Sequence, residues 1–339
     1  MTVRAWAELL RVSALFTVPG DALAGAAARG RRPDRGTALA IGASLCLYEA
    51  GMALNDWADR DEDAIDRPHR PIPSGRIAPG AALAAAGALT AAGLGLAARA
   101  GRPALAVATG LAATVWAYDL RLKHTPAGPA AMAAARGLDL LLGATATGAA
   151  KRPTRWGSGS GPAPGAAARG GLRSALPAAG LLGAHTYAVT AVSRHEAQGG
   201  STTVPLAALA AITALGAAAL RKPGGALPEP GRPEDSPPHA GHGRTREAHG
   251  PWVTPASTTP RLLLTALTGS YFRTAAGPLL HAALNPSAPL TQRAVGGGIR
   301  AMIPLQAALA ARAGAAGTGL AVMGLVPLAR TLARKVSLT

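Results

Sequence analysis

Long stretches without a single Asp, Glu, Lys or Arg alternate along the chain with short segments that are rich in charge. The uncharged stretches are residues 77–98, 103–118, 174–193, 199–220, 274–292 and 313–329. Several of them approach the ~20 residues that an α-helix needs to cross a bilayer. The pattern therefore predicts an all-α fold, a polytopic transmembrane helix bundle.

Ten helical segments are expected from this pattern of apolar and polar positions. They are residues 4–27, 36–57, 79–99, 102–121, 127–149, 173–196, 202–221, 260–284, 289–312 and 315–335. Segment 260–284 differs from the others because it carries Arg261, Arg273 and His281. Since charge is costly inside a bilayer, we expect this segment to lie along the membrane interface or to cap the bundle.

Two segments break the helical pattern and are predicted to be flexible loops within one domain that covers residues 1–339. Residues 151–171 are rich in Pro, Gly and Ser, and residues 222–260 combine Pro, Gly and charge. Such segments cannot bury enough apolar surface to offset the entropy cost of ordering the chain. The second segment also holds His239, His242 and His249, which we interpret as part of a polar loop and not as a metal site.

Composition favours a membrane bundle over its alternative, a soluble Ala-rich bundle. The chain is 49% hydrophobic and only 3% aromatic, with 43 Gly. Small residues let membrane helices approach one another closely, whereas an aromatic content this low is unusual for a soluble core. Cys46 is the only cysteine, which excludes an intrachain disulfide and a cysteine-based metal site.

The formal net charge of +17 does not indicate a nucleic-acid-binding protein. The Arg residues are scattered between apolar segments, and the sequence contains no nucleic-acid-binding module with stacking aromatic residues. Pairing with the anionic headgroups of membrane lipids explains the excess of positive charge more simply.

The densest negative charge follows directly after the apolar stretch 37–54. Five carboxylates lie close together there: Asp56, Asp59, Asp61, Glu62 and Asp63. Asn55, Asp59 and Asp63 recur at i, i+4 and i+8, which places three oxygen ligands on one helix face. Mg²⁺ prefers oxygen ligands and is usually held by one or two carboxylates together with substrate phosphates. The spacing predicts a Mg²⁺ site, and the alternative is a solvated helix end that pairs with Arg60 and Arg67.

The same stretch carries a resemblance to a known family. Asn-Asp-x-x-Asp-x-x-x-Asp at 55–63, followed by Arg-Pro-x-Arg-Pro-Ile-Pro-Ser-Gly at 67–75, resembles the first signature of the UbiA-type intramembrane prenyltransferases. The resemblance implies about nine transmembrane helices and a Mg²⁺-dependent site for an isoprenyl diphosphate. It implies roles in catalysis, metal binding or substrate binding for these residues: Asn55, Asp56, Asp59, Asp63, Arg67 and Arg70.

Residues 118–123, Tyr-Asp-Leu-Arg-Leu-Lys, resemble the segment that follows the fourth span in the same family. The family's lysine contacts the diphosphate, which implies this role for Lys123, with Tyr118 and Arg121 as further substrate-binding residues. Cations that face a diphosphate stabilise the negative charge that grows as the C–O bond breaks. The alternative is an interfacial anchor whose cations reach the lipid headgroups.

The resemblance to this family also implies a second acidic motif, Asp-x-x-x-Asp-x-x-x-Gly-x-x-Thr-Leu-Pro, between the sixth and seventh spans. The segment Gly200-Ser201-Thr202-Thr203-Val204-Pro205 matches its end. Counting back from Gly200 places Glu196 at one acidic position and Val192 at the other. This motif therefore retains one carboxylate, Glu196, as a metal and substrate ligand.

Some polar residues fall inside apolar segments. Arg136 and Asp139 are three residues apart, so an intrahelical ion pair is expected. His185 and His281 are interpreted as packing residues whose ring nitrogens find hydrogen-bond partners.

Together these features predict a multi-pass prenyltransferase of the cell membrane that uses Mg²⁺ to transfer an isoprenyl group from its diphosphate to an unidentified acceptor. The alternative is a non-catalytic relative that binds or transports a lipid or isoprenoid precursor, which Val192 favours. A CDP-alcohol phosphatidyltransferase is disfavoured because its Asp-Gly-x-x-Ala-Arg opening is absent. The site is expected to face the cytoplasm, where isoprenyl diphosphates are made, although the positive-inside rule favours the opposite orientation.

Overall fold

The described part of the chain is built entirely from helices. The computed structural model describes residues 3–11, 16–148, 164–196, 199–221 and 258–327. The helices are α1 (Val3–Leu9), α2 (Val18–Ala28), α3 (Arg35–Ala58), α4 (Arg60–Asp66), α5 (Pro79–Ala100), α6 (Arg102–Ala117), the π-helical turn η2 (Tyr118–Leu122), α7 (Gly128–Ala146), α8 (Pro164–Ser193), α9 (Thr203–Leu220), α10 (Thr258–Leu284), α11 (Ala288–Arg312) and α12 (Ala316–Met323). The predicted all-α fold is confirmed.

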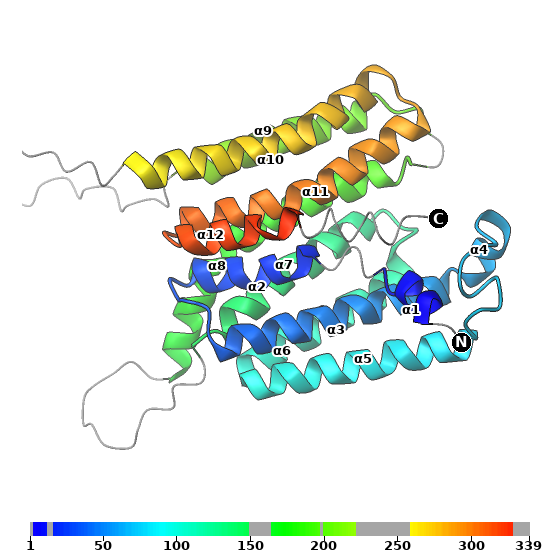
Figure 1. Ribbon diagram of the computed structural model, residues 1–339, viewed down its shortest axis with the longest axis horizontal. Helices are drawn as coiled ribbons and strands as arrows, with labels where there is room; N and C mark the ends of the chain where they lie inside the picture. The colour runs from blue at the N-terminus through cyan, green and yellow to red at the C-terminus, as the bar shows by residue number, and fades with distance from the viewer. Residues whose placement is uncertain (1–2, 12–15, 149–163, 197–198, 222–257, 328–339) are drawn as a thin grey trace, which may run out of the picture.

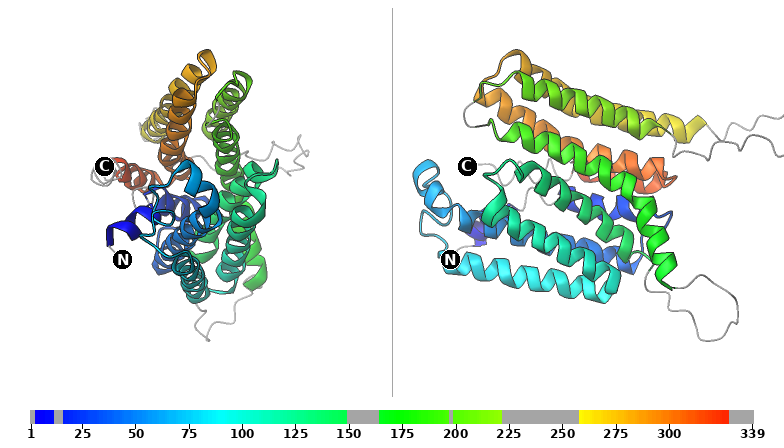
Figure 2. Two further views of the ribbon diagram at one scale, coloured as in Figure 1. Left: turned by 90° about the vertical axis from the view of Figure 1, so that its right-hand side faces the viewer. Right: turned by 180° about the vertical axis from the view of Figure 1, so that it is seen from behind.

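The longer helices lie side by side, and the connections between them gather at the two ends of a bundle (Figure 1). Within the described residues, five helical stretches are long and apolar enough to cross a membrane: Arg35–Ala58, Pro79–Ala100, Leu172–Ser193, Thr203–Leu220 and Ala288–Arg312. The acidic helix α4 stands at one end of the bundle, beside α1, and the α2–α3 connection lies at the other end (Figures 1 and 2). The architecture therefore places the acidic motif at the mouth of a bundle of membrane-spanning type.

Helices α2 and α7 show why small residues dominate this chain. A Cβ atom on Gly25 would lie 2.1 Å from the carbonyl oxygen of Leu140, and one on Gly143 would lie 2.4 Å from Ala22 Cα. Only glycine permits contacts this close, and dispersion contacts of this kind hold membrane helices together.

Three expectations about the elements need correction. The expected helix 4–27 is two helices, α1 and α2. Helix α8 begins at Pro164, so residues 164–171 are helical where a loop was expected. The rest of the two predicted loops lies outside the described residues, apart from residues 258–260 at the start of α10. Finally, α10 packs along both α9 and α11 and belongs to the bundle, where an interfacial or capping position was expected (Figure 1).

A buried polar cluster joins four helices inside the bundle. Arg136 Nη1 on α7 lies 2.9 Å from Asp21 Oδ2 on α2. Gln306 Nε2 on α11 donates to Asp21 Oδ1 at 2.6 Å. Asp139 accepts a hydrogen bond from Ser44 on α3. Arg136 therefore pairs with Asp21 on another helix, where an intrahelical pair with Asp139 was predicted.

The two histidines that fall in apolar segments behave differently. His185 is fully buried, with Nδ1 3.1 Å from the Tyr271 hydroxyl and Nε2 3.0 Å from the Gly298 carbonyl oxygen, so the predicted packing role is confirmed. His281 is exposed near the end of α10, so it does not pack in the core as expected.

Candidate active site

The first acidic motif spans the junction between α3 and α4. The backbone departs from helical geometry at Asp59, where φ is −89° and ψ is 4°. The N–H groups of Asp59 and Asp63 nevertheless donate to the carbonyl oxygens four residues earlier, at 2.9 and 2.8 Å. The helical hydrogen bonding therefore continues from α3 into α4, and the helix axis bends at Asp59.

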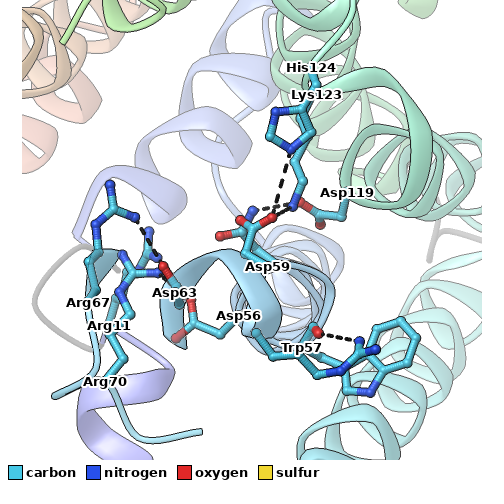
Figure 3. A network of polar contacts seen from close by, with 12 residues as sticks. Arg11, Asp56, Trp57, Asp59, Asp63, Arg67, Arg70, Asp119, Lys123 and His124 are labelled. Carbon is cyan, nitrogen blue, oxygen red and sulfur yellow. Dashed lines mark hydrogen bonds and ion pairs between the residues drawn. The ribbon is translucent and has the colours of Figure 1, made fainter. Parts of the chain in front are cut away.

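One group of polar residues, which we call the lysine cluster, consists of Asn55, Asp59, Asp119 and Lys123. Figure 3 labels Asp59, Asp119 and Lys123. Lys123 Nζ donates to Asp59 Oδ1, and Asn55 Nδ2 donates to Asp119 Oδ1 at 3.2 Å. His124 Nε2 lies 3.9 Å from Asp59 Oδ1. The cluster joins the end of α3 to η2.

A second group, the arginine cluster, consists of Arg11, Asp56, Asp63, Arg67 and Arg70 (Figure 3). Asp56 Oδ1 accepts from Arg11 at 3.0 Å and from Arg70 at 3.4 Å. Asp63 accepts from Arg70 at 2.7 Å and from Arg67 at 3.3 Å. Asp56 and Asp63 are 5% and 1% exposed, so these arginines neutralise buried charge. The Arg67–Asp63 pair of the solvated-helix alternative is thus present, although Asp63 itself is buried.

The expected ligand face is divided between these two clusters. Asn55 and Asp59 belong to the lysine cluster, whereas Asp63 points to arginines. A spacing of four residues overshoots one turn by ~40°, so that i and i+8 diverge by ~80°. The bend at Asp59 adds to this divergence. Asp59 is therefore the carboxylate of the predicted ligand set that lies beside Lys123.

The π-helical turn η2 directs side chains into the lysine cluster. The N–H of Lys123 donates to the Tyr118 carbonyl oxygen at 3.0 Å, which closes the wide turn. Asp119 is 5% exposed, and burial raises its pKa to about 7 although Asn55 and Lys123 oppose the shift. Burial, with the charge of Asp119, also raises the pKa of Tyr118. Short π-helical turns occur frequently at functional sites.

An open cleft of about 400 Å³ lies in front of the lysine cluster. Its lining includes Asp59, Glu62, Arg121, Lys123 and His124. Carboxylate and imidazole atoms of Asp59, Glu62 and His124 lie within 4.8 Å of one another. Asp59 and Glu62 place hard carboxylate oxygens there, the ligand type that Mg²⁺ prefers, so the residues present fit this ion. Asn55 belongs to the adjoining lysine cluster through its hydrogen bond to Asp119. Both predicted clamp cations, Arg121 and Lys123, border the same cleft.

The second motif reaches this end of the bundle with one carboxylate. Glu196 is half-buried, and burial raises its pKa while the nearby charge of Arg67 opposes the shift. Val192 is 1% exposed and belongs to an apolar core cluster with Ile212 and Leu279. Glu196 therefore lies close enough to the first motif to interact with Arg67, whereas Val192 faces the core.

Sequence reasoning left out of the predicted site three residues that the structure places beside Asp59 or Lys123: Glu62, Asp119 and His124. Asp119 lies in the segment 118–123, in which only Tyr118, Arg121 and Lys123 were given roles. Its spacing of four from Lys123 was the available signal. Arg11 is distant in sequence from Asp56, and no local pattern connects the two residues.

The bundle and its end cleft define a polytopic helical membrane protein with an acidic, lysine-bearing site. A model of the UbiA prenyltransferase family matches residues 13–221, more than half of the chain. The protein therefore belongs to the UbiA prenyltransferase family, which confirms the resemblance inferred from the first motif.

Known proteins support this placement. A digeranylgeranylglyceryl phosphate synthase of Methanopyrus kandleri is 37% identical over 129 residues, which are 37% of this chain and 46% of the relative. The chain thus spans about half the length of this relative. A solved UbiA homologue from Aeropyrum pernix K1 has a TM-score of 0.56 at 17% identity, covering 87% of this chain and 96% of its own. A solved structure of digeranylgeranylglyceryl phosphate synthase has a TM-score of 0.55 at 15% identity, and the match covers 92% of this chain and 98% of its own. These two likenesses establish a shared fold.

Proposed function

We propose that this protein transfers an isoprenyl group from an allylic isoprenyl diphosphate to an acceptor, with Mg²⁺ as cofactor. The observation that carries the proposal is the lysine cluster at an open cleft, where Asp59 and Lys123 lie side by side. A Mg²⁺–diphosphate complex would match this pair, because its metal suits Asp59 and its phosphate oxygens suit Lys123. The family's name and the relatives' names agree with this activity.

The protein's own residues would act mainly by binding and by electrostatics. Asp59 would hold the metal together with Glu62 and Asn55, with Glu196 as a further ligand from the second motif. Mg²⁺ would supply Lewis-acid stabilisation of the leaving diphosphate. Lys123 and Arg121 would bind phosphate oxygens and stabilise the charge that grows there. Tyr118 stands beside them as a further substrate contact.

The arginine cluster would have a different task in this mechanism. Arg67 and Arg70 neutralise Asp63 in the present structure, and Asp56 is paired with Arg11. We infer that Asp63 and Asp56 shape the mouth and position its cations. Because Arg70 is paired with Asp63, Asp63 would be free to bind the metal only if Arg70 left this pair and bound the diphosphate.

The reaction balances without a covalent enzyme intermediate. The C–O bond of the allylic diphosphate breaks, and diphosphate leaves with the electron pair. An electron pair of the acceptor forms the new bond to the allylic carbon, and the proton that the acceptor loses is taken up by the released diphosphate. The isoprenoid tail would lie between the helices. The relatives are named for different end products, so the acceptor and the chain length stay open.

The test is diphosphate release from radiolabelled isoprenyl diphosphates of several chain lengths, with Mg²⁺ and a native lipid extract, in membranes that contain the protein. We expect Asp59→Asn to lower turnover by at least ~100-fold, because losing a charged metal ligand removes several kcal/mol and each 1.36 kcal/mol is tenfold. The matched control is Asp61→Asn, which removes an exposed carboxylate of the same cleft. Equal turnover in the wild type and Asp59→Asn would overturn the assignment.

The second candidate is a non-catalytic relative that binds or transports an isoprenoid precursor. Two observations favour it: protein cations already neutralise Asp56, Asp59 and Asp63, and Val192 stands where the second motif has an acid. This candidate predicts binding of the labelled diphosphate without release of inorganic diphosphate for any chain length.

A further inference from the structure

Asp119 is a buried carboxylate at the site for which neither the metal nor the substrate contacts described above give a role. It belongs to the lining of the cleft but is only 5% exposed, and it approaches α3 near Gly51, which has no side chain. A Cβ atom on Gly51 would lie 3.9 Å from Asp119 Oδ2 and 3.0 Å from Val115. The wide turn of η2 brings the carboxylate into the lysine cluster, and the absence of a side chain on Gly51 leaves room for Val115 beside it.

The first consequence concerns the orientation of Asn55. Asn55 Nδ2 donates to Asp119 Oδ1 at 3.2 Å. An amide binds a metal only through its oxygen, and an ionised carboxylate only accepts hydrogen bonds. The contact therefore turns the NH₂ group toward Asp119 and leaves Asn55 Oδ1 on the opposite side of the amide. Partners behind a ligand orient metal sites in this manner.

The second consequence concerns Lys123. In the present structure Lys123 is paired with Asp59. A metal bound by Asp59 would weaken that pair. Asp119 lies on the same turn, four residues before Lys123, and its negative charge also interacts with the ammonium group. It would keep the lysine at the cleft once Asp59 is engaged.

We propose that Asp119 is a positioning residue, which presents the Asn55 carbonyl oxygen to Mg²⁺ and retains Lys123 for the diphosphate. The proposal rests on the proposed function.

The experiment measures Mn²⁺ binding by electron paramagnetic resonance in the purified full-length protein, with and without inorganic diphosphate. Mn²⁺ replaces Mg²⁺ as a visible probe, and no acceptor is needed. We expect Asp119→Ala to weaken the binding of Mn²⁺ with diphosphate by ~10- to 100-fold, as is typical for residues that orient a metal ligand. Asp119→Asn keeps an oxygen for the Asn55 NH₂ group but removes the charge, so its affinity should fall between those of the wild type and the alanine variant.

Two controls separate positioning from a general loss of charge or fold. Asp61→Ala removes an exposed acid from the same cleft and should leave the affinity unchanged. In an Asn55→Ala background, Asp119→Ala should have a much smaller effect than in the wild type, because part of its action passes through Asn55. Additive effects would overturn the orienting role, and an asparagine variant that binds like the wild type would overturn the role of the charge.

The outcome also distinguishes this inference from the proposed function. Equal affinity of the wild type and Asp119→Ala would overturn the inference alone. Failure of the wild type to bind Mn²⁺ with diphosphate would overturn the proposed function and the inference that rests on it. Asp119→Asn is close in shape to the native residue and provides the test if the alanine variant does not fold.

Discussion

At the scale of single residues, the site is held together by ion pairs that substrate binding must rearrange. Lys123 neutralises Asp59, and Arg70 bridges Asp56 and Asp63. Such pairs compensate the charge of these carboxylates, since an uncompensated buried charge is costly. The sequence indicated Asp59 and Lys123 as neighbours in one site, but it could not show which cation faces which acid, because the pairs with Arg11 and Lys123 span 45 and 64 positions.

The apolar residue in the second motif gives a prediction at the same scale. Val192 lies in the apolar core, so Val192→Asp would bury a charge without a partner. We expect it to destabilise the fold by more than ~3 kcal/mol, whereas Val192→Ala, which removes only packing atoms, should cost ~1–2 kcal/mol. Thermal unfolding of both variants in detergent measures the difference. Higher turnover in a stable Val192→Asp variant would show instead that residue 192 reaches the site.

At the scale of the elements, the hydrophobic pattern predicted most of the long helices to within a few residues, including α3, α5 and α9. The hydrophobic pattern gave wrong bounds or a wrong location where contacts with other helices determine the structure. The apolar composition of residues 4–27 concealed the division into α1 and α2. The Gly- and Pro-rich start of α8 has weak helix propensity, so its sequence resembled a loop. The role of α10 was obscured by Arg261 and Arg273, both of which are exposed.

The interior ion pair predicts how strongly helices α2, α7 and α11 depend on one another. Arg136→Met should destabilise the protein by ~3–5 kcal/mol, because it leaves the fully buried Asp21 without this cation. The double variant Asp21→Asn with Arg136→Met should recover much of that loss, since the buried charge is removed as well. Thermal unfolding in detergent tests both variants, and equal melting temperatures of the wild type and Arg136→Met would contradict the prediction.

At the scale of the whole molecule, the two ends of the bundle differ in charge. The end with α4 mixes acids with cations, whereas the α2–α3 connection at the opposite end carries Arg29, Arg31, Arg32 and Arg35 with Asp34 as its one acid. The positive-inside rule would place the arginine-rich end in the cytoplasm. The substrate would place the acidic end there, because isoprenyl diphosphates are made in the cytoplasm. The positive-inside rule describes a statistical bias in membrane insertion, whereas the site must be able to reach its proposed substrate. We therefore choose the orientation that places the acidic end in the cytoplasm.

This choice predicts which end of the protein an impermeant reagent can reach. In a Cys46→Ser background, cysteines at two exposed positions, Asp66→Cys and Arg32→Cys, report on opposite ends of α3. We expect a membrane-impermeant maleimide to label Arg32→Cys in intact cells and Asp66→Cys only after permeabilisation. Labelling in the reverse pattern would place the cleft outside the cytoplasm. A cytoplasmic isoprenyl diphosphate could then reach the cleft only by crossing the membrane, which would favour a binding or transport role over transferase activity.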